Sequence, residues 1–208
     1  MNSEEAKIRM AEGRIYQPGD EGILKEQFLC MEKLYDFNAT RPSEQKKRQD
    51  MLKDMFAEIG ANCYIEPPLH ANFGGKHVHF GRNVYANYNL TLVDDGHIYV
   101  GDCVMIGPNV TIATDGHPVE PHLRRQGLQY NIDVHIGSNV WIGAGAVILP
   151  GITIGNDTVI GAGSIVTKDI PAGVVAVGNP CRILREIGEH DRKYYFRDRF
   201  IDVEIPQE

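Results

Sequence analysis

Aliphatic residues recur at every sixth position in the second half of the chain, and this period restricts the fold more than any other feature. The series consists of Ile136, Ile142, Ile148, Ile154, Ile160 and Val166. A six-residue period matches neither an α-helix, which repeats about every 3.6 residues, nor a strand with alternating faces. A short unit repeated at fixed spacing is typical of a solenoid, whose stacked coils bury a continuous core. We therefore predict an all-β solenoid with these side chains inside.

Small residues after the aliphatic positions indicate where the coil turns a corner; they are Gly137, Gly143, Gly155 and Gly161. The same register continues upstream from Phe80 to Ile112, with two extra residues near Gly96. It stops after Ile112 and resumes at Ile136, so residues 113–133 are predicted to be a loop inserted into a continuing coil. Insertions of this kind tend to lie on one face of a solenoid and often carry its function.

The regions on either side of the repeats are rich in charge and have helical patterns. Apolar residues at helical spacing predict a helix from Pro42 to Ile59 and a second from Lys25 to Phe37, the latter with Phe28, Leu29, Leu34 and Tyr35 as its apolar residues. We expect residues 1–60 to be a helical cap on the first coil, which would otherwise expose its core. Residues 61–180 form the predicted solenoid. Residues 181–208 are expected to add a short helix and strand packed along its outside.

Composition restricts the kind of partner. The formal net charge of −7 argues against a nucleic-acid-binding protein. The four cysteines (Cys30, Cys63, Cys103 and Cys181) lie far apart, so they suggest neither a disulfide framework nor a zinc knot. The sequence contains neither a recognisable signal peptide nor an apolar run of membrane-spanning length. We expect a cytoplasmic protein that does not interact with membranes.

Several motifs accompany the repeats, namely NYNLTLVDDG, TDGHPVEP, GITIGND, VIGAGSIVTKDIP and GNPCR. In this combination the chain resembles the galactoside and maltose O-acetyltransferases over nearly its whole length. That resemblance implies a left-handed parallel β-helix and the transfer of an acetyl group from acetyl-CoA to a sugar hydroxyl, with no metal. It also implies a homotrimer whose active sites lie between subunits. We expected Val110, Val134 and Val140 to point outward on the faces that pack around the threefold axis.

His117 is the candidate catalytic base, because an alcohol becomes a good nucleophile only when its proton leaves. It lies at the start of the inserted loop and matches the catalytic histidine of the family. The sequence near His117 offers no nucleophile with an activating partner, which favours direct transfer over an acetyl-enzyme. Asn87 occupies a corner position where neighbouring coils have glycine. The resemblance implies that it stabilises the charge developing on the thioester oxygen.

The resemblance also suggests four acceptor-binding residues: Asp20, Asn72, Asp95 and Gln129. Asn72 stands where the family usually has a small hydroxyl residue, and Gln129 where the galactoside enzymes have an apolar one. These departures concern the choice of acceptor more than the reaction.

A coenzyme A site needs a narrow groove for the pantetheine arm and positive charge for the phosphates. Ala144 and Ala162 are three repeat units apart, so we expect them to stack one above the other along such a groove. The family match adds four candidates for the phosphate and adenine end of the cofactor: Thr167, Lys168, Arg182 and Arg185. Trp141, the sole tryptophan, occupies an outward position in its unit, and we expect it to pack on pantetheine or against another subunit.

Three other interpretations remain at this point. An amino sugar or amino acid in place of a sugar hydroxyl would change the acceptor only. A γ-type zinc carbonic anhydrase on the same fold would use three histidines, for which His79, His117 and His122 are available. A non-catalytic scaffold would keep the repeats but has no need for the His117 loop.

Overall fold

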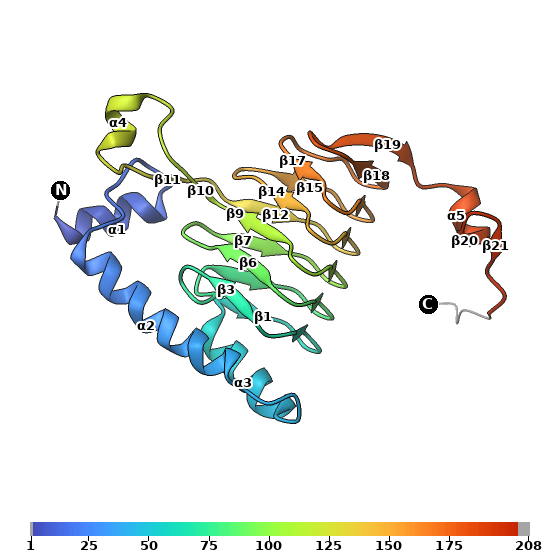
Figure 1. Ribbon diagram of the computed structural model, residues 1–208, viewed down its shortest axis with the longest axis horizontal. Coiled ribbons are helices and arrows are strands. Elements are labelled where there is room, and N and C mark those ends of the chain that lie inside the picture. Colours follow the sequence, from blue (N-terminus) through green and yellow to red (C-terminus); the bar gives the residue numbers. More distant parts are fainter. Residues whose placement is uncertain (1, 204–208) are drawn as a thin grey trace.

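A computed structural model describes residues 2–203, and most of this chain is wound into a parallel solenoid with three flat faces (Figure 1). The first face contains β1 (Glu58–Ile59), β4 (Val78–Phe80), β7 (Ile98–Val100), β12 (Val134–Ile136) and β15 (Thr153–Ile154). The second contains β2 (Tyr64–Ile65), β5 (Tyr85–Ala86), β8 (Met105–Ile106), β13 (Trp141–Ile142), β16 (Val159–Ile160), β18 (Val174–Val177) and β19 (Arg182–Glu186). The third contains β3 (Leu69–Ala71), β6 (Leu90–Val93), β9 (Thr111–Ala113), β14 (Val147–Ile148) and β17 (Ile165–Val166).

The six-residue aliphatic series forms the core, as predicted. Ile136 pairs with Ile154 and Ile142 with Ile160 on parallel strands of successive coils. The residues of the series are buried and belong to one continuous hydrophobic cluster that runs through the coils. Because each aliphatic residue lies directly above its equivalent in the next coil, the core grows by one identical layer per turn.

The expectation that Val110, Val134 and Val140 point outward is wrong, because all three are fully buried. Side chains alternate along a strand, so the residue two positions before each series member also points inward. Each side of the coil therefore contributes two inward residues, and the outward positions are those between them, such as Trp141.

The corners explain the small residues of the repeat. A Cβ atom on Gly143 would lie 2.5 Å from the backbone nitrogen of Ala162 in the next coil. Other corners contain residues in the left-handed region, including Asn83, Asn109 and Asn139 with φ of 56° to 58°. Asparagine tolerates this conformation better than most residues. The corners thus require either no side chain or one suited to a positive φ.

Three helices lie on the N-terminal side: α1 (Ser3–Ala11), α2 (Glu21–Asn38) and α3 (Gln45–Met55). Figure 1 shows α2 running along the outside of the coils, with α3 beside the first coil. The predicted helix Pro42–Ile59 ends earlier, because Glu58 and Ile59 form β1 and pair with β4. Helix α1 was not predicted.

The predicted apolar face of the second helix is also wrong in part. Leu34 is buried against the solenoid, but Phe28, Leu29 and Tyr35 are 61%, 62% and 73% exposed. Leu34 and Phe37 are three positions apart and form the buried side of α2. The other three residues therefore remain apolar surface on the single chain.

The C-terminal residues extend away from the solenoid and do not pack along its outside as expected (Figure 1). β19 pairs antiparallel with β18 at the end of the second face. It leads into a C-terminal arm, residues 187–203, that contains α5 (Glu189–Lys193), β20 (Tyr194–Phe196) and β21 (Arg199–Phe200). None of the helices within residues 2–203 has both the length and the hydropathy needed to cross a bilayer.

Candidate active site

Two corners of the solenoid carry the candidate functional residues. The Asn87 edge joins the second face to the third and includes Asn87, Ala144 and Ala162. The His117 edge joins the third face to the first and includes the segments 72–77, 94–97, 114–133 and 167–170. Asn72, Asp95, His117, Gln129, Thr167 and Lys168 therefore all lie on the His117 edge. The six-residue register alone had not grouped these residues by edge.

The inserted segment is a hairpin that leaves the coil after β9 and returns at β12. Its base is the antiparallel pair β10 (Asp115–Gly116) and β11 (Tyr130–Asn131), and a short helix α4 (Pro121–Arg125) lies near its tip. β12 then pairs with β7 as if no residues had been inserted. The hairpin therefore projects from the His117 edge (Figure 1) without disturbing the stacking.

His117 is exposed at the base of this hairpin, and one contact fixes the tautomer of its neutral ring. Its Nδ1 lies 2.7 Å from the carbonyl oxygen of Leu128. A carbonyl oxygen only accepts hydrogen bonds, so the neutral imidazole carries its proton on Nδ1. The lone pair of Nε2 is left available, which is the state a general base requires.

Asp95 brings two other predicted residues together. Its Oδ2 accepts from the side-chain amide of Asn72 at 2.7 Å, and its Oδ1 accepts from Gln129 Nε2 at 3.0 Å. Asp95 and Gln129 are buried. Asn72 and Gln129 thus bind the same carboxylate, and they hold it in one orientation.

Two residues that sequence reasoning missed extend this network to the N-terminal segment. Gln129 Nε2 donates to the hydroxyl of Tyr16 at 2.7 Å, and Asn131 Nδ2 donates to the backbone oxygen of Asp95 at 3.1 Å. Tyr16 is fully buried. Burial and the nearby Asp95 carboxylate raise the pKa of Tyr16 well above its usual value, so it stays neutral. No sequence motif marks Tyr16, which lies between two helices.

Asp20 occupies the N-cap of α2. Its Oδ1 accepts from the backbone nitrogens of Gly22 and Ile23, and its Oδ2 accepts from Ser3 Oγ at 3.0 Å. Both carboxylate oxygens thus have a structural role that joins the start of α2 to α1. The structure does not link Asp20 to the Asp95 network through a hydrogen bond within residues 2–203.

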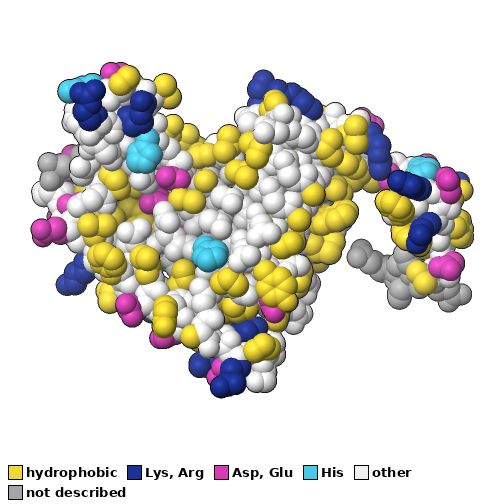
Figure 2. All heavy atoms as spheres, in the orientation of Figure 1, with side chains coloured by type: hydrophobic (Ala, Val, Ile, Leu, Met, Phe, Trp, Pro, Cys, Tyr) yellow, Lys and Arg dark blue, Asp and Glu magenta, His cyan; other side chains and the backbone are white. Residues whose placement is uncertain are grey.

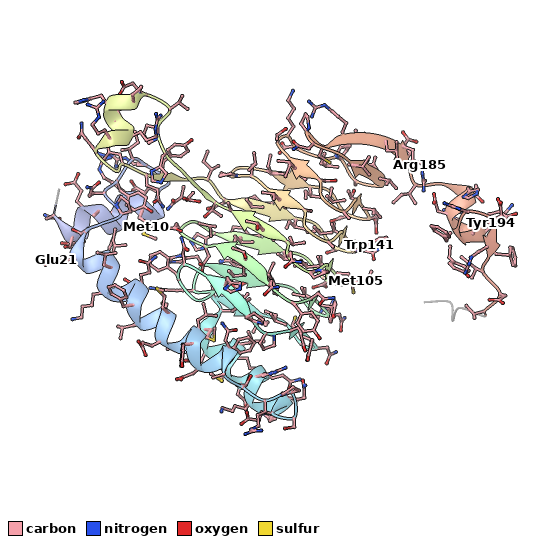
Figure 3. All side chains as sticks on the ribbon, in the orientation of Figure 1. Met10, Glu21, Met105, Trp141, Arg185 and Tyr194 are labelled. Atoms are coloured by element: carbon pink, nitrogen blue, oxygen red, sulfur yellow. The ribbon has the colours of Figure 1, made fainter. Side chains whose placement is uncertain are left out.

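The predicted pantetheine groove follows the Asn87 edge. Ala144 and Ala162 are exposed and stack in adjacent coils, where Gly163 N donates to the Ala144 oxygen at 2.8 Å. Trp141 is 53% exposed on the second face and pairs with Met105 of the coil before it. Figure 3 shows these two side chains near each other at the same side of the solenoid.

The predicted phosphate-binding residues differ in their availability. Thr167 and Lys168 are exposed on the last coil, and within residues 2–203 the Arg182 guanidinium donates only to the backbone oxygen of Cys181. Arg185 is instead engaged by Asp191 through two hydrogen bonds of 2.7 Å. This pair holds the pKa of the Asp191 carboxyl well below its usual range. A phosphate would have to compete with Asp191 for Arg185.

The three histidines of the zinc interpretation are not brought together. His79 lies on the first face and contacts His97, whereas His122 is in α4 and contacts Gln126. Within residues 2–203 there is no group of three or more His, Cys, Asp or Glu side chains arranged to hold a metal ion.

A hexapeptide solenoid with a histidine-bearing hairpin on one edge and stacked small residues on another defines the class of hexapeptide-repeat acyltransferases. Residues 9–60 match the maltose acetyltransferase hexapeptide capping motif, and residues 133–168 match the bacterial transferase hexapeptide model. The chain is 52% identical to a galactoside O-acetyltransferase of Lactococcus lactis subsp. lactis, covering 96% of this chain and 97% of the relative.

Comparison with solved structures leads to the same group of enzymes. A galactoside acetyltransferase in complex with coenzyme A superimposes with a TM-score of 0.91 at 47% identity, over 95% of this chain and 98% of that one. A maltose O-acetyltransferase from Clostridium difficile gives 0.87 at 44% identity, over 91% and 99%. The chain belongs to the galactoside and maltose O-acetyltransferase family. Its fold is the left-handed parallel β-helix of that family, and it is an acetyl-CoA-dependent acyltransferase.

Proposed function

We propose that this enzyme transfers the acetyl group of acetyl-CoA directly to a hydroxyl of a galactoside, glucoside or maltose-type sugar, with His117 as general base. The observation that carries the proposal is the Leu128 carbonyl on His117 Nδ1, which leaves Nε2 free. His117 Nε2 takes the hydroxyl proton as the sugar oxygen bonds to the thioester carbon. The carbon–sulfur bond then breaks, and the proton passes to the thiolate of coenzyme A.

Asn87 is proposed to stabilise the negative charge on the thioester oxygen during this step. Its Oδ1 accepts from Tyr88 N at 2.8 Å, which orients the side-chain NH₂ to donate. Because Asn87 and His117 lie on different edges of one solenoid, the two residues act together only when the Asn87 edge of one copy faces the His117 edge of another. We therefore propose a homotrimer with sites between its subunits, which is the symmetric way to satisfy this requirement three times.

The second face supports such packing. Tyr85, Met105 and Trp141 lie in one outward column, each 42% to 53% exposed. Figure 2 shows hydrophobic side chains gathered on this side of the solenoid. A contiguous apolar strip of this kind is typical of a protein interface.

We also propose that the enzyme is located in the cytoplasm.

The assembly can be tested by sedimentation velocity. We expect a species of three 23.2 kDa chains. Trp141→Glu should place a charge in the interface and shift the protein toward monomer, with loss of most activity. Thr153→Glu, at an exposed outward strand position on the first face, is the matched control and should stay trimeric. A monomer with full activity would contradict both the trimer and the shared site.

The cofactor groove gives a second test. Ala162→Trp should fill the groove and raise the KM for acetyl-CoA at least about tenfold, which corresponds to about 1.4 kcal/mol of lost binding. Ala172→Trp is the control. Ala172 is also an exposed alanine, and it lies directly above Gly155 just as Ala162 lies directly above Gly143. It differs in lying on the remaining corner of the coil, which joins the first face to the second. If both variants bind acetyl-CoA like the parent, the groove has been placed on the wrong edge.

The acceptor class is tested by acetyl-CoA consumption over galactosides, glucosides, maltose, amino sugars and amino acids. Activity on hydroxyl-bearing sugars without an amine supports the proposal. Activity confined to amines would overturn it in favour of N-acetylation.

A further inference from the structure

A cavity of about 200 Å³ lies between helices α1 and α2 and the His117 edge, beside Asp95. Met10, Ile23 and Phe73 provide its apolar wall, and all three are buried members of the small cluster that joins α1 and α2 to the solenoid. Figure 3 shows Met10 at the junction of α1 with the coils. His77 and His97 provide its polar wall. The reaction proposed above makes no use of these two histidines.

The backbone determines which nitrogen of His77 faces a ligand. Nδ1 lies 2.6 Å from the carbonyl oxygen of Asp94, so it must carry the proton. Nε2, the nitrogen farther from the backbone, then has an uncommitted lone pair. Burial lowers the pKa of His77, which keeps the ring neutral and its lone pair available.

One contact leaves Nε2 of His97 uncommitted as well. His97 Nδ1 lies 2.9 Å from His79 Nε2, and one of these two nitrogens carries the proton that they share. His97 Nε2 is therefore available to a ligand, as an acceptor in one tautomer and as a donor in the other. A hydroxyl group can pair with either form, and burial lowers the pKa of this ring.

The formal charges of Lys7, Lys76, Glu26 and Asp95 at the cavity sum to zero. Lys7 of α1 pairs with Glu26 of α2 at 2.8 Å, and Lys76 contacts the same glutamate. The cavity therefore has an apolar wall and one carboxylate, Asp95. Its polar wall carries two imidazole rings whose centroids are 5.4 Å apart. This lining suits a ligand that has hydroxyl groups on one side and an apolar surface on the other.

We propose that the cavity is a second acceptor subsite that holds a hexose unit next to the one that is acetylated. A pyranose ring presents C–H groups on its faces and hydroxyl donors at its rim, which match Phe73 and Met10 on one wall and the two Nε2 atoms on the other. The volume lies below that of sites for extended drug-sized ligands, so it fits a single ring. Asp95 connects the subsites, because it lines the cavity and also binds Asn72 and Gln129.

This inference rests on the proposed function and predicts that the preferred acceptor is at least a disaccharide. His97→Phe keeps an aromatic ring beside His79 but removes the ring nitrogen that would bind the sugar. With maltose or lactose we expect its KM to rise about tenfold, as for the loss of one hydrogen bond to substrate. With glucose or galactose both KM and kcat should stay within about twofold of the parent. Equal effects on disaccharides and monosaccharides would overturn the subsite.

A second variant and a direct binding measurement guard against misfolding and against failure of the reaction itself. Met10→Trp should fill the cavity and weaken maltose selectively, whereas Ile8→Trp on the exposed side of α1 should not. The ¹⁵N signal of His97 Nε2 should shift when maltose is added without acetyl-CoA. If no sugar is acetylated but this shift occurs, the proposed reaction fails and the subsite stands. If maltose leaves the signal unchanged, the subsite is rejected whatever the activity.

Discussion

Replacing His117 with alanine is expected to lower kcat by about 10²- to 10⁴-fold, the usual contribution of a positioned general base. The imidazole meets the acceptor hydroxyl and not the phosphates of coenzyme A, so the affinity for acetyl-CoA should change little. The measurement is steady-state turnover with saturating acetyl-CoA, together with calorimetric titration of coenzyme A into the variant.

His122→Ala is the matched control because it removes a histidine from the same hairpin. His122 Nε2 lies 3.0 Å from Gln126 Nε2, a surface contact within α4 and its end, so turnover should stay near that of the parent. A His117→Ala enzyme with near-normal turnover would remove the base from the mechanism. Isolation of an acetylated protein in the absence of sugar would contradict direct transfer.

Gly143→Ala is expected to lower the free energy of unfolding by at least about 3 kcal/mol, at the upper end of the usual cost of overpacking. The new methyl group would meet the backbone nitrogen of Ala162, which cannot rotate away as a side chain can. Coil separation would have to increase where Gly143 N donates to the Ile160 oxygen at 2.7 Å. Urea unfolding at fixed protein concentration measures the change.

Gly163→Ala separates steric overlap from backbone strain. Gly163 has a φ of 68°, but a Cβ atom there would have no neighbour within 4 Å. We expect only the cost of a left-handed alanine, about 1–2 kcal/mol. If Gly143→Ala is no more destabilising than this control, the coils are less tightly stacked than the geometry indicates.

The solenoid could be predicted from the sequence because every repeat needs an aliphatic side chain at the same position. Ile136, Ile142 and Ile148 each fill the same layer position, so one pattern predicts many contacts. The second inward position, occupied by Val134 and Val140, was misplaced because a rule of one inward residue per six omits the alternation within each short strand.

Polar contacts between residues far apart in the sequence could be predicted less well. Asp95 was identified through its motif, but its partners Tyr16 and Asn131 belong to no pattern that a single sequence displays. Tyr16 meets Gln129 across a separation of 113 residues, and only the folding of the hairpin back onto the N-terminal segment brings them together. Similarly, Asn87 and His117 lie on different edges because the coil has a triangular cross-section, and their spacing in the sequence does not reveal this.

The backbone bridge between Tyr16 and Gln129 has a consequence for how the chain is made. During synthesis, α2, α3 and the first coils can form in the order in which they emerge from the ribosome, because each coil stacks on the one made before it. The segment around Tyr16 must wait until the hairpin has been translated. A nascent chain arrested before residue 129 should therefore carry a folded solenoid base with an undocked N-terminus that proteases can cut.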